Sequence, residues 1–270
     1  VPLIESGFSH KAHSHASAVG YWQFISPTGK RYGLKINTYV DERKDPLLST
    51  QAAAEYFSAL YNLFGDWYLA LASYNTGENR VKRAVMRTRT RNFWKLAKKR
   101  KLPRETRNYV PKFIAAALIY QDPAKYGFNN IDYQPAATFD KIAVSRSMSL
   151  LTLSKNLNVS FDSLKDLNPK FRSDFVAVCS GKNEVLRVPK GLGMVALEAV
   201  SKSYASAPKT KFSRVYIYHR IRRGDTLSGI AVRYRTRVRT LRSLNGLSRR
   251  SLLRIGRRLK VPERGVYRVA

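Results

Sequence analysis

The sequence feature that most limits the possible folds is an internal repeat in the second half of the chain. Seven positions recur at an offset of 77 residues, the separation of Leu150 from Leu227. They are Leu150, Leu153, Leu157, Phe161, Leu164, Leu167 and Asn168 in the first copy, and Leu227, Ile230, Tyr234, Val238, Leu241, Leu244 and Asn245 in the second. Each copy later closes on Val-Pro. Because such repeats are tandem structural units, the chain cannot fold as one continuous domain.

Each copy has the sequence pattern of a small α+β unit. Its apolar positions predict two short helices between two strands. Between the copies, residues 191–213 have the pattern of a helix that leads into a Ser/Ala/Pro-rich segment. We therefore expect a small module over 131–190, a helical linker over 191–213 and a second small module over 214–270.

The first 130 residues differ, since few of them alternate between apolar and polar with a period of two. Apolar residues recur instead at helical spacing, and helices are expected over residues 46–64, 67–74, 80–88, 91–101 and 104–121. Pro111 should interrupt the last helix, which Asp122-Pro123 should end. The expected fold class is multidomain: an all-α domain over 1–130, followed by two small α+β modules with the order β-α-α-β.

The charge of the chain is strongly positive, with 50 Lys+Arg against 18 Asp+Glu and a formal net charge of +32. Residues 1–130 and 191–270 hold 21 and 20 of the basic residues. Such a surface attracts polyanions, which include nucleic acid, anionic lipid headgroups and acidic cell-wall polymer. No apolar run approaches the ~20 residues that a membrane-spanning helix needs. The charge therefore indicates a class of partner but no chemistry.

Other features of the composition exclude two kinds of site. The single cysteine, Cys179, excludes an internal disulfide and a thiolate-type zinc site. His10, His13 and His15 have no carboxylate at ligand spacing, so we expect an exposed polar loop, no metal and no cofactor. The chain opens directly on Val1, as though cut from a larger precursor, so the missing signal segment says nothing about its compartment.

The second repeat carries a specific motif. It reads Tyr218-x-x-Ile221-x-x-Gly224-Asp225-Thr226-Leu227-x-x-Ile230-Ala231-x-x-Tyr234, then Val238, Leu241, Asn245 and Gly256-x-x-Leu259-x-Val261-Pro262. Gly224 permits a turn after the first strand, and Asp225 or Thr226 can cap the first helix. The motif resembles a LysM domain, which implies binding of glycans that contain N-acetylglucosamine. The candidate glycan-binding residues are Gly224, Asp225, Thr226, Leu227 and Asn245.

The first repeat is a weaker match to the same domain. Ser147-Met148-Ser149 stands where the second repeat has Gly-Asp-Thr. It resembles a degenerate LysM domain, and we predict no sugar site in it. A simpler interpretation of the second repeat also stays open, because five arginines between residues 233 and 242 would let a small basic fold bind any anion.

Four short motifs occur in order along the helical domain. They are Glu5-Ser6-Gly7-Phe8, Gly20-Tyr21-Trp22-Gln23-Phe24, Ala72-Ser73-Tyr74-Asn75-Thr76-Gly77 and Tyr109-Val110. Together they resemble the soluble lytic transglycosylase family, glycoside hydrolase family 23, whose fold is related to goose-type lysozyme. With the LysM modules, the resemblance covers essentially the whole chain. It implies a lysozyme-like catalytic domain over 1–130.

The resemblance also implies roles for single residues. Glu5 matches the catalytic acid of the family, and Gln23 is a candidate hydrogen-bond partner for the sugar. The implied substrate-binding residues are Ser6, Gly20, Tyr21, Trp22, Gln23, Tyr74, Asn75 and Tyr109. The sequence departs from the family at Tyr21 and Phe24, which are bulkier or more aromatic than the usual aliphatic residues, and at Ser73, which replaces a usual alanine. The first departure would reshape a sugar subsite.

Glycoside cleavage needs an acid whose pKa is raised, and apolar neighbours of Glu5 can supply that desolvation. Ordinary glycosidases add a second carboxylate. The family resembled here uses one glutamate twice: first as acid, then as base on the C6 hydroxyl of N-acetylmuramic acid. The 2-acetamido group assists, and a 1,6-anhydro sugar forms. Structural roles are expected for the other acidic candidates, Asp41, Glu42, Asp45 and Glu78.

A basic run covers residues 80–107, with thirteen Lys/Arg and one acid, Glu105. Such a run is usually a solvated helix face, and here it can also lie against anionic envelope polymers or lipids. No recognition helix, finger or aromatic platform accompanies the charge, so nucleic acid is not the expected partner.

The predicted function is cleavage of the β-1,4 bond between N-acetylmuramic acid and N-acetylglucosamine in peptidoglycan. The first choice is a lytic transglycosylase that acts as a monomer on glycan strands and is periplasmic or secreted, as the resemblance implies. One alternative is a hydrolytic lysozyme, including one tuned to a de-N-acetylated glycan. Another is a cell-wall-binding protein without activity. The chemistry at Glu5 separates these three.

Overall fold

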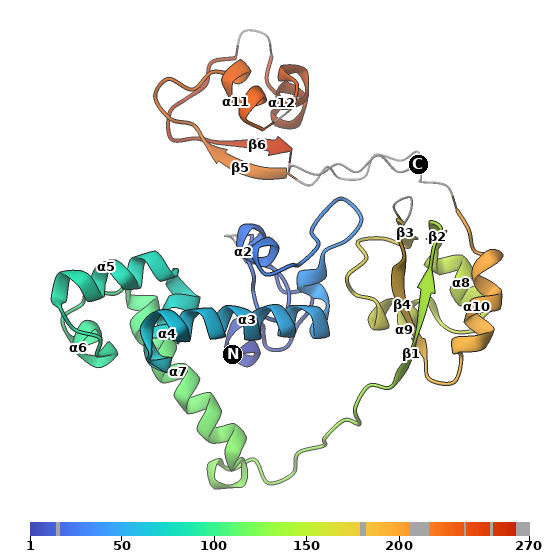
Figure 1. Ribbon diagram of the computed structural model, residues 1–270, viewed down its shortest axis with the longest axis horizontal. Helices are drawn as coiled ribbons and strands as arrows, with labels where there is room; N and C mark the ends of the chain where they lie inside the picture. Colours follow the sequence, from blue (N-terminus) through green and yellow to red (C-terminus); the bar gives the residue numbers. More distant parts are fainter. Residues whose placement is uncertain (15–16, 179–181, 206–215, 235, 249–250, 263–270) are drawn as a thin grey trace. The chain divides into compact units, whose positions relative to one another are not determined.

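A computed structural model describes residues 1–14, 17–178, 182–205, 216–234, 236–248 and 251–262 of the chain (Figure 1). These residues fall into two units, one of which holds Val1–Ile36 and Glu42–Thr138, and the other Asn37–Asp41 and Phe139–Ala270. The first unit is helical, and the second contains the two small modules. No helix in the described ranges is both long enough and apolar enough to cross a membrane.

The helical unit follows the predicted order of helices. They are α1 (Pro2–Ser6), α2 (Ser26–Arg31), η1 (Glu42–Lys44), α3 (Pro46–Phe64), α4 (Trp67–Thr76), α5 (Glu78–Thr88), α6 (Phe93–Lys98), α7 (Arg104–Gln121) and η2 (Ala124–Tyr126). The predicted interruption at Pro111 is wrong, because α7 runs through it. Pro111 is exposed, while Tyr109 and Val110 beside it are buried in the core and hold the helix in place despite the missing hydrogen bond.

Capping residues determine where α3 begins and ends and where α4 begins. Asp45 begins α3 by accepting hydrogen bonds from the amides of Leu47 and Leu48, both at 3.1 Å. Gly65 ends α3 in the left-handed conformation, and Asp66 caps α4 with a bond of 2.7 Å from an amide in its first turn. Because an N-cap of this kind stabilises a helix by about 1 kcal/mol, the positions of these helix ends are well determined by the sequence.

Helix α4 forms the centre of the helical unit. Leu69, Ala70 and Ala72 are each 0% exposed, and α4 packs against α3, α5 and α7. An apolar residue set on all sides of a helix is typical of one that is buried on all sides. The alanines allow the neighbouring helices to approach closely. This packing fixes the helix whose last turn carries Tyr74 and Asn75 of the predicted site.

The first small module has the predicted order with additions. Its elements are β1 (Phe139–Val144), β2 (Met148–Ser149), α8 (Leu150–Asn156), α9 (Phe161–Leu167), β3 (Phe175–Val176), β4 (Glu184–Pro189) and α10 (Gly193–Ser201). Strands β1 and β4 are antiparallel, with Phe139 opposite Pro189, and β2 pairs with β3 in the same sense. Val40 joins this module, since it is 1% exposed in the core and forms a β-bridge with Phe171.

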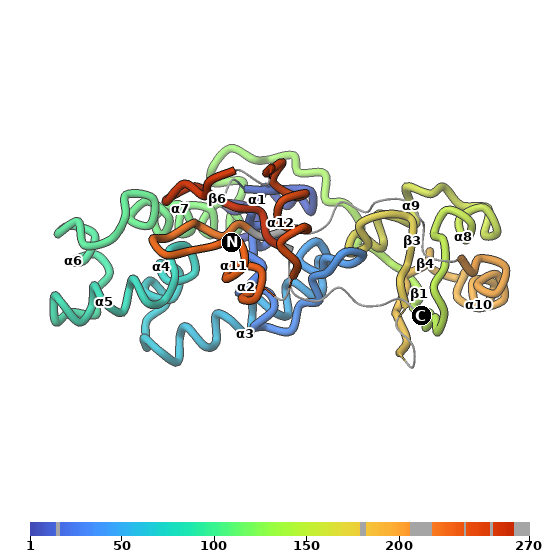
Figure 2. Tube along the Cα trace, turned by 90° about the horizontal axis from the view of Figure 1, so that it is seen from above, coloured from blue at the N-terminus to red at the C-terminus, as the bar shows by residue number. Residues whose placement is uncertain are grey.

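Helix α10 lies within the segment that the sequence predicts as a helical linker, residues 191–213. The helix is present, but Ala196, Ala199 and Val200 are buried in the core of the module. It packs against β1, β4 and α8, and Figures 1 and 2 both show it beside α8. The amide of Ala205 still bonds to the carbonyl of Ser147 at 3.1 Å. We therefore propose that the first module extends to residue 205, while residues 206–213 lie outside the described ranges.

The second small module has the predicted β-α-α-β order without additions. Its elements are β5 (Tyr216–Arg220), α11 (Leu227–Arg233), α12 (Val238–Asn245) and β6 (Arg258–Pro262). The two strands are antiparallel, with His219 opposite Leu259. The buried core is made by Ile221, Ile230, Ala231, Leu241, Leu259 and Val261. The predicted fold class, an all-α domain followed by two small α+β modules, is confirmed.

An asparagine has the same function in both small modules. The side-chain nitrogen of Asn168 donates to the backbone carbonyl of Arg187 at 2.7 Å, and the backbone amide of Arg187 donates to Oδ1 of Asn168 at 3.0 Å. Asn245 exchanges the same pair of bonds with Lys260, at 2.8 Å and 2.7 Å. Each asparagine therefore connects the end of the second helix to the last strand. This shared bond explains why the residue recurs in the repeat.

Candidate active site

The short helix α1 places Glu5 against α7. Pro2 occupies the first turn of α1, and Gly7 ends the helix in the left-handed conformation. Glu5 Oε1 accepts a hydrogen bond of 2.7 Å from the hydroxyl of Tyr109, which is buried on α7. Ile4 packs against the core beside it. The sequence predicted both members of this pair from separate motifs, and the structure brings them together.

Burial raises the pKa of Glu5, and it is the largest of the influences on that carboxyl group. The hydrogen bond from Tyr109 lowers the pKa, while the nearby charge of Glu105 raises it, so the outcome is a raised pKa. Burial and the proximity of Glu5 also raise the pKa of Tyr109, which therefore stays a hydrogen-bond donor. A carboxyl group in such surroundings can hold a proton and release it to a leaving oxygen.

The loop that contains Gly20 and Gln23 is held by close backbone packing at Gly20 and by hydrogen bonds from the Gln23 side chain. Gly20 has φ of +81°, and a Cβ atom there would lie 2.0 Å from the carbonyl oxygen of Arg43, so only glycine fits. The Gln23 side-chain nitrogen donates to the carbonyls of Gly20 at 2.8 Å and Ala12 at 3.2 Å. These bonds give Gln23 a structural role, and its predicted bond to a sugar stays a prediction.

Several predicted residues form one hydrogen-bonded group. The Ser6 hydroxyl donates to the carbonyl of Tyr21 at 2.8 Å, which connects α1 to the loop. The Tyr74 hydroxyl donates to the carbonyl of Trp22 at 2.6 Å, which connects α4 to the same loop. Burial raises the pKa of Tyr74, and the Glu5 charge adds to the shift. The ring of Phe57 stacks on Tyr74 with centroids 4.6 Å apart.

Asn75 is held by two residues that sequence reasoning did not select. Its Oδ1 accepts a hydrogen bond of 2.8 Å from the hydroxyl of Thr106, and its nitrogen donates to Glu105 at 3.3 Å. Both partners lie in the first turn of α7, one turn before Tyr109. A usable signal was present, because the spacing of Glu105 and Tyr109 places them on the same helix face. The charged run around Glu105 obscured it.

The other carboxylates have structural partners, as predicted. Asp41 pairs with Arg172 at 2.9 Å, Glu42 accepts the amide of Lys35 at 2.6 Å, and Asp45 caps α3. Glu78 pairs with Arg31 at 2.9 Å and accepts a hydrogen bond from Tyr56 at 3.2 Å.

The departures from the family pattern have different structural consequences. Phe24 is 2% exposed and packs against the rings of Tyr56 and Tyr74, so it belongs to the core rather than to a sugar-contacting surface. Tyr21 lies against His10, with ring centroids 6.2 Å apart. Ser73 is fully buried, and its hydroxyl has no hydrogen-bond partner among the described residues. Such a group costs about 1–3 kcal/mol, which an alanine would avoid.

Four of the candidate glycan-binding residues lie at the start of α11, and the fifth, Asn245, ends α12. Gly224 has φ of +86°, and the Thr226 hydroxyl caps α11 by accepting the amide of Gly229 at 3.0 Å. Leu227 packs against the core of the module. Asp225 accepts bonds from the amide of Arg222 at 2.7 Å and from a histidine ring at 2.8 Å.

That histidine, His219, is a residue that the sequence motif did not reveal. It is 6% exposed, and its second ring nitrogen lies 3.1 Å from the hydroxyl of Tyr234. The backbone bond from Arg222 and then the bond from His219 lower the pKa of Asp225. The carboxylate of Asp225 therefore stabilises the turn between β5 and α11, in addition to any contact with a ligand.

No group of three or more His, Cys, Asp or Glu side chains in the described parts of the chain is placed to hold a metal ion. His13 forms a backbone β-bridge with Val19 in the loop after α1. His15 and Cys179 lie outside the described residues.

Comparison with protein families gives a match for each module. Residues 1–97 match the transglycosylase SLT domain, residues 138–205 match the LysM-like domain of lytic transglycosylase MltD, and residues 219–262 match the LysM domain. The family match over 138–205 includes α10, in agreement with the packing of that helix.

Relatives of known name extend the similarity over nearly the whole chain. Membrane-bound lytic murein transglycosylase D of Escherichia coli strain K12 is 33% identical over 274 residues, which cover 97% of this chain and 58% of the relative. A putative tributyltin chloride resistance protein of Alteromonas sp. strain M-1 is 43% identical over 86 residues, which cover 32% of this chain and 42% of the relative. The chain thus spans little more than half the length of the transglycosylase that it matches.

Among solved structures, the chain is similar to the 70 kDa soluble lytic transglycosylase SLT70 of Escherichia coli. The match has 23% sequence identity and a TM-score of 0.36, and it covers 41% of this chain and 19% of that protein.

Proposed function

This chain belongs to the family of transglycosylases that join an SLT domain to LysM-type domains, and we propose that it cleaves the β-1,4 bond between N-acetylmuramic acid and N-acetylglucosamine in peptidoglycan. The observation that carries the proposal is the Glu5–Tyr109 pair. Glu5 has a raised pKa because it is partly buried, and the hydroxyl of Tyr109 donates to one of its oxygens at 2.7 Å. One carboxyl group is thereby prepared to give up a proton and to take one back.

In the first step, the Glu5 carboxyl group donates its proton to the bridging oxygen as the bond from that oxygen to C1 of N-acetylmuramic acid breaks. The raised pKa keeps Glu5 protonated until this point. The 2-acetamido group of the same sugar stabilises the positive charge at C1. The hydrogen bond from Tyr109 then stabilises the carboxylate that remains, because bonds to ionised acceptors are stronger than those to neutral ones.

In the second step, the Glu5 carboxylate takes the proton of the C6 hydroxyl group. The C6 oxygen bonds to C1 and closes the 1,6-anhydro ring, so no water is consumed and Glu5 regains its proton. A second catalytic carboxylate would come from the other acidic candidates of the sequence analysis. Each of these, such as Glu78, has a structural partner among the described residues instead. A one-carboxylate mechanism is therefore favoured over the two-carboxylate arrangement of ordinary glycosidases.

The second small module would hold the glycan. In the second module, Gly224, Thr226 and Leu227 lie at the start of α11, and Asn245 ends α12. We assign glycan binding to this module and a structural role to the first, which has Ser147-Met148-Ser149 in place of Gly-Asp-Thr. Because the substrate lies outside the cytoplasm, the proposed location is the periplasm or the exterior. A monomer suffices for this chemistry.

The test is mass spectrometry of the fragments that the protein releases from purified peptidoglycan sacculi. Native and chemically de-N-acetylated sacculi are compared, with Glu5→Gln as the inactive control. We expect glycan ends in the 1,6-anhydro form, lighter than reducing ends by one water, from native sacculi only.

Other products would change the conclusion in defined ways. Reducing ends would establish a hydrolase and require a group that positions water. Release from de-N-acetylated sacculi alone would show that the acetamido group is not used. No release from either substrate, with binding retained, would mean a cell-wall-binding protein and overturn the proposal.

A further inference from the structure

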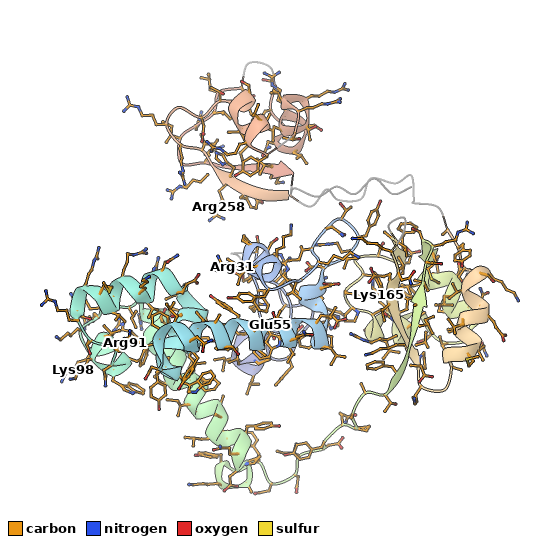
Figure 3. The ribbon with its side chains drawn as sticks, in the orientation of Figure 1. Arg31, Glu55, Arg91, Lys98, Lys165 and Arg258 are labelled. Carbon is orange, nitrogen blue, oxygen red and sulfur yellow. The ribbon has the colours of Figure 1, made fainter. Side chains whose placement is uncertain are left out.

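A strongly basic surface covers α5, α6 and the segments that follow them. We call the thirteen Lys and Arg residues of 80–107 the basic arm. Twelve of them are exposed, the exception being Arg107, which is half-buried. Within the described residues none of the thirteen takes part in an ion pair. Figure 3 labels two of them, Arg91 and Lys98, at the α5–α6 end of the helical unit. The positive charge of the arm is therefore available to an anionic partner.

Aromatic side chains are exposed beside the basic arm. We call Tyr61 on α3, Trp67 and Tyr68 on α4 and Trp94 on α6 the aromatic corner. Trp67 is 55% exposed and stacks on Tyr61, with ring centroids 4.6 Å apart. Trp94 is 46% exposed and packs edge to face on Tyr68, with ring centroids 5.6 Å apart. Met86 on α5 is 71% exposed. Large apolar groups gathered on a surface indicate a site of interaction.

The arm and the corner are continuous. Arg91, in the segment between α5 and α6, reaches the carbonyl of Phe64 at the end of α3, 3.4 Å away. Phe64 lies between Tyr61 and Trp67 in the chain. Trp94 itself belongs to the basic helix α6, next to Lys95. Basic and aromatic side chains therefore meet at this end of the helical unit.

We propose that the aromatic corner and the basic arm together dock onto the surface of an anionic phospholipid bilayer. The basic side chains would meet the headgroup phosphates, since each Lys or Arg near an anionic membrane adds about 1 kcal/mol of binding free energy. Trp and Tyr rings are favoured at the boundary between headgroups and acyl chains, where one end is apolar and the other is wet. An acidic polymer in water would use the cations but offer no apolar layer for Trp67 and Trp94.

The proposal goes beyond the cleavage reaction and can be tested without a glycan. The full chain is sedimented with vesicles of phosphatidylglycerol and phosphatidylcholine, and with phosphatidylcholine alone. Binding is expected only with the anionic lipid, with a blue shift of tryptophan emission. The chain has three tryptophans, and the two outside the Glu5 region lie in the aromatic corner, so the shift reports this face.

A charge variant and a matched control locate the binding surface. The change Lys95→Glu, Lys98→Glu and Lys99→Glu on and after α6 should weaken vesicle binding at least 100-fold, or about fivefold for each cation lost. The control makes the same change in charge at three exposed lysines of the first small module, Lys155, Lys182 and Lys202. It should bind within a few-fold of the unchanged protein. Equal losses in the two variants would overturn the proposal in favour of general charge attraction.

A second variant separates a bilayer from a soluble polyanion. Replacing Trp67 and Trp94 with alanine should weaken binding to anionic vesicles roughly tenfold and remove the blue shift, because less apolar area is buried. Binding to polyphosphate, used as the soluble polyanion, should not change. If vesicle binding is also unchanged, the face binds anionic polymers rather than lipid. Peptidoglycan cleavage is measured separately in each variant, so failure of either proposal is recognised by itself.

Discussion

Two glutamates of the helical unit each accept a hydrogen bond from a buried tyrosine, but their surroundings shift their pKa values in opposite directions. Tyr109 donates to Glu5 at 2.7 Å, and Tyr56 donates to Glu78 at 3.2 Å. Arg31, at the end of α2 and labelled in Figure 3, lies 2.9 Å from Glu78. Within the described residues, no Lys, Arg or His side chain forms an ion pair with Glu5.

The difference shows that a tyrosine hydrogen bond alone does not decide the role of a glutamate here, because the other groups that oppose burial differ between the two positions. Burial raises the pKa at both positions and is the largest single influence on each. At Glu78, backbone and side-chain hydrogen bonds and the charge of Arg31 together exceed it, so the pKa is lowered and the group stays ionised. At Glu5 burial prevails, and the group can serve as an acid.

The largest expected effect is the loss of activity in Glu5→Gln. An amide cannot donate the proton, so kcat/KM on sacculi should fall by about 10²–10⁴-fold, the usual contribution of an acid–base group. The melting temperature should not fall, because a carboxyl group with a raised pKa is less stable when ionised in the folded state. Glu78→Gln is the matched control and should keep activity within a few-fold. Equal losses of activity in the two variants would break the comparison.

The pH dependence of cleavage tests the raised pKa directly. Since Glu5 must begin protonated, activity should fall about tenfold for each pH unit above its pKa. The raised pKa moves this alkaline limb above the pH expected for an exposed glutamate. The measurement is kcat/KM against pH on solubilised glycan strands. A limb at the position of an ordinary glutamate would mean that burial does not act on Glu5 in solution.

Removal of the tyrosine hydroxyl should have a smaller effect. Tyr109→Phe keeps the ring in the core but removes a hydrogen bond to a charged group, which contributes about 1.5–3 kcal/mol. We expect kcat to fall at least tenfold, because the carboxylate formed in the first step loses its partner. The alkaline limb should move to higher pH, since the bond from Tyr109 lowers the pKa of Glu5. Tyr56→Phe is the control beside Glu78 and should leave the limb in place.

Much of this architecture could be predicted from the sequence. The repeat indicated two modules because the apolar residues and the asparagine at its positions, such as Leu241 and Asn245, meet structural needs that recur in each module. The ends of α3 and α4 lie close to the predicted ones because the caps Asp45, Asp66 and Gly65 act locally. The pairing of Glu5 with Tyr109, 104 residues apart, came instead from the resemblance to a family.

What the sequence could not give depended on contacts made only in the folded chain. The helix over 193–201 has an apolar stripe, but nothing in that stripe says that β1 and β4 lie beneath it. Glu105 stood in a basic run, and its contact with Asn75 requires α4 and α7 to be packed together. Glu78 likewise has a structural role only because the fold brings it to Arg31, which is 47 residues away in the sequence.

The second glutamate should matter for stability instead of activity. Glu78→Gln removes a partly exposed ion pair with Arg31, so the free energy of unfolding should fall by about 1 kcal/mol near neutral pH. Because the pKa of Glu78 is lowered in the folded state, its stabilising effect is present above the pKa of an unfolded glutamate and is lost as the pH falls through the lowered value. Denaturant unfolding of the two proteins at neutral and acidic pH should therefore show a difference that disappears in acid.

The smallest expected effect concerns Glu105, whose negative charge raises the pKa of Glu5 from the first turn of α7. In Glu105→Gln the side-chain oxygen can still accept the hydrogen bond from Asn75, so the site should keep its geometry while it loses a charge. The alkaline limb of the pH profile should move to lower pH, with a change of no more than a few-fold in kcat/KM below the limb. This sharpens the comparison, because it adjusts the acidity of Glu5 by a like charge in the way that Arg31 adjusts Glu78 by an opposite one. A fall in kcat at every pH without movement of the limb would show instead that Glu105 acts through the position of Asn75 alone.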